Sequence, residues 1–99
     1  MITIWRGAHS RSLYDHLRLS WPSNHLTVLV PPLLKNFEFI KNLPQDEVQF
    51  LGEWDALPTV KPLGKTTWPE LPRLGVFTSG TLSGAPRLVF YSKQNIESS

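Results

Sequence analysis

The apolar positions of the chain fall into short runs that predict strands. Residues 1–5 alternate isoleucine with threonine, which predicts a short strand. Residues 26–30, Leu-Thr-Val-Leu-Val, are apolar, β-branched and uncharged, which suits a strand buried on both faces. The apolar runs at 48–51, 74–77 and 87–91 predict three further strands.

Helical spacing appears between the first two runs. Residues 10–20 predict a helix, and Ser10 is placed to cap its first turn. The apolar face of this helix is expected to hold Leu13, Tyr14 and Leu17.

A second helix is predicted after the two prolines that end the strand at 26–30. Pro32 suits the first turn of a helix, and Asn42 and Pro44 then stop it. Its apolar positions have helical spacing and are Leu33, Phe37 and Ile40. Strand, helix and strand in this order, over residues 26–52, are typical of an α/β protein with a parallel sheet.

Residues 53–73 differ from the rest of the chain, because they hold four prolines and no long apolar run. We expect a long ordered loop that Trp54 and Trp68 attach to the body of the domain. Further on, Ser92 resembles the cap of a helix that has hardly begun at Ser99. We therefore expect an incomplete sheet, whose exposed edge favours self-association.

Composition and charge narrow the class of protein. Ninety-nine residues make one small domain or part of a larger one, and the net charge is +2. The lysines and arginines are scattered, which argues against nucleic-acid binding, and the absence of cysteine excludes disulfides and thiolate zinc sites. The N-terminal residues lack the apolar core of a signal peptide, and the longest apolar run, 26–34, is too short to span a membrane. We expect a soluble cytoplasmic protein.

The segment between the last two predicted strands, F-T-S-G-T-L-S-G-A-P-R at 77–87, carries the candidate chemistry. Glycines let a backbone approach an anion closely, hydroxyls offer donors that rotate, and an arginine presents a planar fork that matches phosphate. The candidate phosphate-binding residues are Thr78, Ser79, Gly80, Thr81, Ser83, Gly84 and Arg87. A plain hairpin turn explains the same composition, so chemistry alone leaves both interpretations open.

The longer stretch F-T-S-G-T-L-S-G-A-P-R-L-V-F-Y-S-K-Q-N-I resembles the phosphate-binding loop of the adenylate-forming enzyme superfamily. The family pattern is roughly [YF]-T-S-G-[ST]-T-G-x-P-K-G-V, then two apolar residues and [ST]-H-x-N before an apolar position. The matching residues are Phe77, Thr78, Ser79, Gly80, Thr81, Gly84, Pro86, Val89, Ser92, Asn95 and Ile96. The chain departs from the pattern by one extra residue before Pro86, and by Arg87, Leu88 and Lys93 in place of lysine, glycine and histidine.

The resemblance implies that residues 1–99 are an N-terminal part of an AMP-binding domain, similar to that of acyl-CoA synthetases. Such a ligase uses ATP and Mg²⁺ to convert a small carboxylate to an acyl-adenylate, and coenzyme A then accepts the acyl group. The seven candidate residues named above would bind the β- and γ-phosphates. The resemblance places no catalytic residue or metal ligand in this stretch, and we expect the 99-residue chain alone to be inactive as a ligase.

A second interpretation stays open beside this one. The chain can be a small stand-alone α/β module whose Ser/Thr/Gly loop binds a phosphate-bearing ligand or a protein partner. The three histidines, His9, His16 and His25, lack metal-ligand spacing and are expected at the surface or on a helix. The four tryptophans are expected to be core residues and loop anchors.

Overall fold

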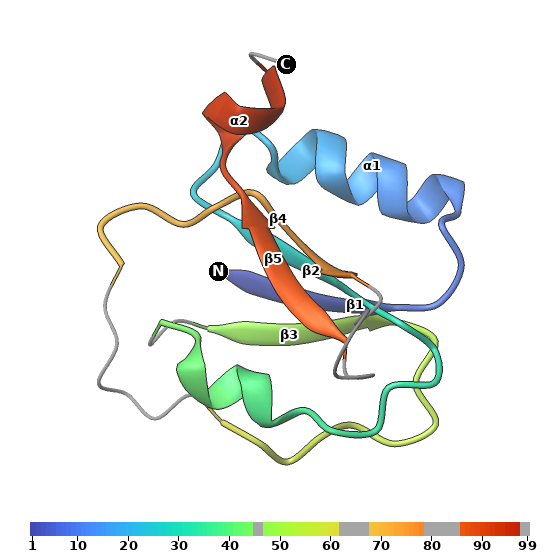
Figure 1. Ribbon diagram of the computed structural model, residues 1–99. Helices are drawn as coiled ribbons and strands as arrows, with labels where there is room; N and C mark the ends of the chain where they lie inside the picture. Colours follow the sequence, from blue (N-terminus) through green and yellow to red (C-terminus); the bar gives the residue numbers. More distant parts are fainter. Residues whose placement is uncertain (45–46, 62–67, 79–85, 98–99) are drawn as a thin grey trace.

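A computed structural model describes residues 1–44, 47–61, 68–78 and 86–97 of the chain (Figure 1). This part contains five strands, two α-helices and one 3₁₀ helix. In chain order they are β1 (Ile2–Arg6), α1 (Arg11–Ser20), β2 (Leu26–Val30), η1 (Glu38–Asn42), β3 (Val48–Gly52), β4 (Leu74–Thr78), β5 (Arg87–Tyr91) and α2 (Lys93–Glu97). The predicted α/β class is confirmed, and so are the five predicted strands, to within one residue at each end.

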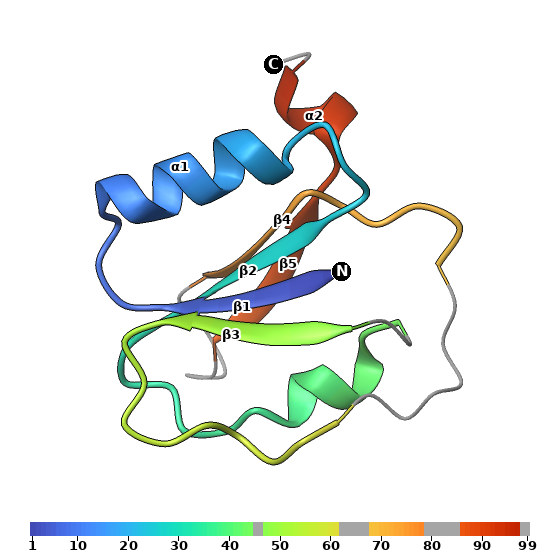
Figure 2. The same ribbon diagram turned by 180° about the vertical axis from the view of Figure 1, so that it is seen from behind.

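The strands form one mixed sheet in the order β3-β1-β2-β4-β5. Strands β1 to β4 are parallel, and β5 pairs antiparallel with β4. The chain crosses from β1 to β2 in one direction and from β2 back past β1 to β3 in the other. Because such crossovers are right-handed, the reversal places α1 and η1 on opposite faces of the sheet, as Figures 1 and 2 show. Because β1 to β4 are parallel, their C-terminal ends all lie at the same edge of the sheet, which we call the carboxyl edge.

The face that η1 covers, here called the apolar face, carries the main hydrophobic core. Every second residue of β1 and β2 points into it, as the period of a strand requires. The buried members are Ile2, Ile4, Leu26, Val28, Val30, Ile40, Leu43 and Leu71. Aromatic rings extend this core toward β4. Phe39 of η1 packs edge-on against Phe77 of β4, with 5.2 Å between ring centroids.

The face that α1 covers, here called the polar face, is built from the intervening residues of the same strands. Thr3 and Thr27 are fully buried there. The hydroxyl of Thr3 lies 2.7 Å from Nε2 of His25 and accepts a hydrogen bond of 2.8 Å from the amide of Gln49. The hydroxyl of Thr27 lies 3.3 Å from Nε2 of His16, on α1.

One expectation about α1 is wrong. Tyr14 was placed on the apolar side of this helix, but it is 64% exposed, whereas Leu13 is buried and Leu17 is partly buried. The expectation of histidines at the surface or on a helix fits His9, which is exposed, and His16, which lies on α1. His25 is partly buried, and its ring meets that of His16 edge to face at 5.1 Å.

The helix predicted from Pro32 is also largely wrong, because only the 3₁₀ helix η1 forms in this segment. The side chain of Asn36 accepts a hydrogen bond of 2.9 Å from the backbone N–H of Glu38, which replaces a helical backbone bond with a local turn. Leu33 is 87% exposed, so its helical spacing to Phe37 produces no common face.

The tryptophans of the 53–73 segment act as anchors, as the sequence predicts. Trp54 donates a 2.7 Å hydrogen bond to the carbonyl of Leu51 and packs edge-on against Phe50. Trp68 packs edge-on against Phe90, with 5.4 Å between centroids. Within the described residues of this segment, 53–61 and 68–73, no helix or strand forms, so the loop prediction holds for them.

Candidate functional site

The carboxyl edge of the sheet is the place where open α/β folds bind ligands. The ends of β1, β2, β3 and β4 meet there, together with the start of β5. Three hollows lie along this edge, and Gly7, the first residue after β1, lines all three. Gly7 has a φ of +125°, a backbone conformation that side chains disfavour. The chain thus turns sharply away from β1 at the centre of the edge.

Thr78 and Arg87 lie opposite each other in the last pair of the β4–β5 ladder. The hydroxyl of Thr78 donates a 3.3 Å hydrogen bond to the carbonyl of Arg87. Val76 pairs with Leu29 of the polar face, so strand alternation also puts Thr78 on that face. The guanidinium of Arg87 is exposed and makes no hydrogen bond or ion pair within the described part of the chain, which leaves it able to bind an anion.

The structure therefore brings together two of the seven predicted phosphate-binding residues. Thr78 and Arg87 flank the predicted loop on neighbouring strands at the carboxyl edge. The other five, Ser79, Gly80, Thr81, Ser83 and Gly84, lie outside the described residues.

A hollow of about 190 Å³ lies beside Thr78, over the ends of β2 and β4. Its walls are mainly apolar and are formed by Gly7, His9, Leu29, Val30, Pro31, Pro32, Val76 and Phe77. His9 is the one titratable side chain among these eight residues, and Phe77 directly precedes Thr78.

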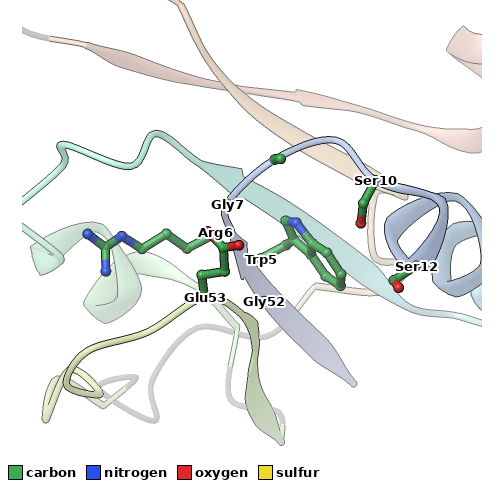
Figure 3. A pocket seen from close by; sticks show the side chains of 8 residues that line it. Trp5, Arg6, Gly7, Ser10, Ser12, Gly52 and Glu53 are labelled. Carbon is green, nitrogen blue, oxygen red and sulfur yellow. The ribbon is translucent and has the colours of Figure 1, made fainter.

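A second hollow, of about 200 Å³, lies between the ends of β1 and β3, where the strand order reverses (Figure 3). It is lined by Trp5, Arg6, Gly7, Ala8, Ser10, Ser12, Gly52 and Glu53. Gly52 has a φ of +94°, and a Cβ at this position would clash with the backbone carbonyl of Arg6. The residue must be glycine for the next backbone N–H, that of Glu53, to donate its 2.8 Å hydrogen bond to the same carbonyl.

Arg6 links the two sides of this edge. Its guanidinium donates two hydrogen bonds, of 2.7 and 3.2 Å, to the carbonyl of Pro32, and its centre lies 5.6 Å from the ring centroid of Trp54. A third hollow of about 150 Å³ adjoins it, lined by Arg6, Gly7, Pro32, Glu53 and Asp55. The Arg6 guanidinium already binds the carbonyl of Pro32 and lies over the Trp54 ring. It therefore connects segments of the carboxyl edge and is less available to a ligand than Arg87.

The hollow between β1 and β3 was not anticipated from the sequence. The sequence signal that could have indicated it is the position of two glycines. Gly7 directly follows β1 and Gly52 is the last residue of β3, and parallel strands end at a common edge. Glu53, the first residue after β3, is exposed. Its side chain nevertheless lies along Gly7 and forms one wall of the hollow.

Comparisons with protein-family models, with curated proteins and with solved structures find no match to this chain. The described ranges contain no group of three or more histidine, aspartate or glutamate side chains that could hold a metal ion. The same ranges contain no helix with the length and apolar character needed to cross a membrane. The functional argument below therefore starts from the residues at the carboxyl edge.

Proposed function

We propose that this chain supplies the ATP phosphate-binding loop of an ATP-dependent acid–thiol ligase. In the proposed reaction a carboxylate oxygen attacks the α-phosphorus of ATP, the bond to the β-phosphate breaks, and pyrophosphate leaves. The thiol of coenzyme A then attacks the acyl carbonyl, and AMP leaves. The 78–87 segment holds the β- and γ-phosphates and stabilises the charge that develops on pyrophosphate.

The observation that carries the proposal is the pairing of Thr78 with Arg87 at the carboxyl edge. A hydroxyl, and a guanidinium that has no partner among the described residues, then flank the loop at the edge where α/β folds bind phosphates. These two groups fit phosphate oxygens and not a divalent cation, so in this proposal Mg²⁺ arrives bound to ATP.

The helix after the loop supports the same proposal. Ser92 and Asn95, which match the resemblance, form a reciprocal cap at the start of α2. The backbone N–H of Asn95 donates to the Ser92 hydroxyl at 3.1 Å, and that hydroxyl donates to the Asn95 side-chain oxygen at 2.8 Å. The motif residues thus have a physical role in starting the helix that follows the strand–loop–strand unit.

The test is the binding of inorganic triphosphate and of MgATP to the purified chain by titration calorimetry. A charge-assisted hydrogen bond contributes about 1.5–3 kcal/mol, so we expect Arg87→Ala to weaken binding about ten-fold or more. The matched control is Arg18→Ala, because Arg18 is an exposed arginine on α1 that pairs with Asp15. Equal affinities of the wild type and Arg87→Ala would refute the role assigned to Arg87.

The stand-alone binding module is the second candidate function. The observation that favours it is that hollows lined by Gly7 lie at the carboxyl edge apart from Thr78 and Arg87, neither of which lines them. If a ligand without phosphate binds in these hollows and triphosphate does not bind, the second candidate is preferred.

A further inference from the structure

The first turn of α1 opens onto the hollow between β1 and β3. Ser10 and Ser12, from the cap and the first turn, both line that hollow. The hydroxyl of Ser10 makes no capping hydrogen bond to its own helix, and the first turn carries no acidic residue. Within the described ranges, the backbone N–H groups of Arg11 and Ser12 also lack partners. Unpaired donors and the helix dipole favour an acceptor or an anion at this position.

A buried indole gives an independent indication of a ligand. Trp5 lines the same hollow and is 8% exposed, yet its Nε1–H has no hydrogen-bond partner among the described residues. Figure 3 shows the nitrogen edge of the ring turned toward the loop that leads from Gly7 to Ser10. A buried indole N–H normally finds an acceptor, because leaving it unpaired costs free energy.

The opposite wall of the hollow offers an acceptor. The side chain of Glu53 rises from the end of β3 and runs along Gly7 (Figure 3). Its carboxylate makes no hydrogen bond or ion pair within the described part of the chain. A carboxylate binds hydroxyl or ammonium groups and repels anions. The hollow therefore has a donor end at α1 and an acceptor end at Glu53.

We infer that this hollow binds a small organic acid that carries an ammonium or hydroxyl group beside its carboxylate. The ligand carboxylate accepts hydrogen bonds from the Trp5 indole, from the hydroxyls of Ser10 and Ser12 and from the first turn of α1, and its donor group binds Glu53. A volume of about 200 Å³ is smaller than the pockets that hold drug-sized molecules, so the ligand has few heavy atoms. This inference uses neither the 78–87 segment nor ATP, and it goes beyond the proposed function.

The test is a titration of the ¹⁵N-labelled chain with glycine, glycolate and acetate, followed by NMR. We expect saturable shifts of the Trp5 indole N–H and the Ser12 amide, and at least several-fold tighter binding of glycine or glycolate than of acetate. Glycine binding more tightly than glycolate identifies the ligand as an amino acid, and the reverse order identifies a hydroxy acid. If none of the three probes gives a saturable shift, the inference is overturned.

Two variants separate this site from a general effect of charge. Glu53→Gln is expected to remove the preference over acetate, whereas Glu70→Gln, a matched change of an exposed carboxylate, is expected to preserve it. Trp5→Phe keeps a ring but removes the N–H, and we expect several-fold weaker binding at the Ser12 amide. Identical behaviour of Glu53→Gln and Glu70→Gln would contradict the inference. Arg87→Ala is expected to leave glycine binding unchanged, so failure of either proposal is visible separately.

Discussion

The two faces of the sheet differ in chemistry, although the same strands build both. On the apolar face, Ile2, Ile4 and Val28 are fully buried among aliphatic and aromatic side chains. On the polar face, Thr3 and Thr27 are just as buried, but each bonds to a histidine. Adjacent residues of one strand thus enter two different environments.

The difference shows how each face fixes its helix. Dispersion and hydrophobic burial are non-directional. The apolar face therefore determines which side of η1 is buried, but it constrains the position of η1 on the sheet only loosely. Hydrogen bonds are directional, so the contact of His16 with Thr27 holds α1 at one place over β2. That placement brings Ser10 and Ser12 to the hollow at the carboxyl edge.

The largest expected effect comes from removing side-chain volume on the apolar face. Ile4 is fully buried at the centre of the sheet, between β2 and β3. We expect Ile4→Ala to lower the free energy of unfolding by about 2–5 kcal/mol, because it removes buried methyl groups and leaves a cavity. Urea denaturation measures this change. Leu33→Ala is the control, since Leu33 is 87% exposed, and a loss for Ile4→Ala no larger than that control would contradict the assignment of this core.

The apolar face was also the part of the fold that the sequence predicted best. Period-two alternation and continuous apolar runs located the five strands that the structure describes. Such patterns can be recognised from neighbouring residues alone, without knowing which strands pair. The helix expected from Pro32 failed for a local reason: the Asn36 side chain bonds to the backbone. The sheet order could not be derived, because the choice of β1 as the partner of β3 depends on contacts across the whole chain.

A smaller effect, but a sharper test of the comparison, comes from exchanging hydroxyl and methyl groups on neighbouring residues. Val28→Thr places a hydroxyl with no partner in the apolar face, and we expect a loss of about 1–3 kcal/mol in the free energy of unfolding. Thr27→Val leaves Nε2 of His16 without its partner, and we expect a smaller loss because His16 is only partly buried. Denaturation of both variants measures the difference, and equal losses would mean that the two faces do not differ in this way.

The polar face and the hollow beside it were the parts that the sequence did not predict. Histidines such as His16 occur more often at surfaces, and nothing in the local sequence shows that Thr27 lies below it. The hollow between β1 and β3 needs the ends of these two strands and the first turn of α1 to meet. By contrast, the placement of Thr78 and Arg87 at the ends of two paired strands could be predicted, because both strands are visible as local apolar runs.

The smallest expected effect concerns pH and belongs to the polar face alone. Burial disfavours the charged form of His16 and lowers its pKa below the ordinary value of 6.5. At pH values above 6.5 the group is neutral in both the folded and the unfolded state and contributes no pH dependence. As the pH falls through 6.5, the unfolded state takes up a proton more readily than the folded state, so the free energy of unfolding decreases.

His16→Gln tests this prediction, because glutamine retains a polar side chain but does not titrate. We expect the decrease in the free energy of unfolding between pH 7.5 and pH 5.5 to be smaller in this variant than in the wild type, as measured by urea denaturation at both values. His9→Gln is the control, since His9 is exposed, and it is expected to retain the wild-type decrease. An unchanged decrease in His16→Gln would show that burial on the polar face does not penalise a charge, and the distinction between the two faces would then rest on hydrogen-bond geometry alone.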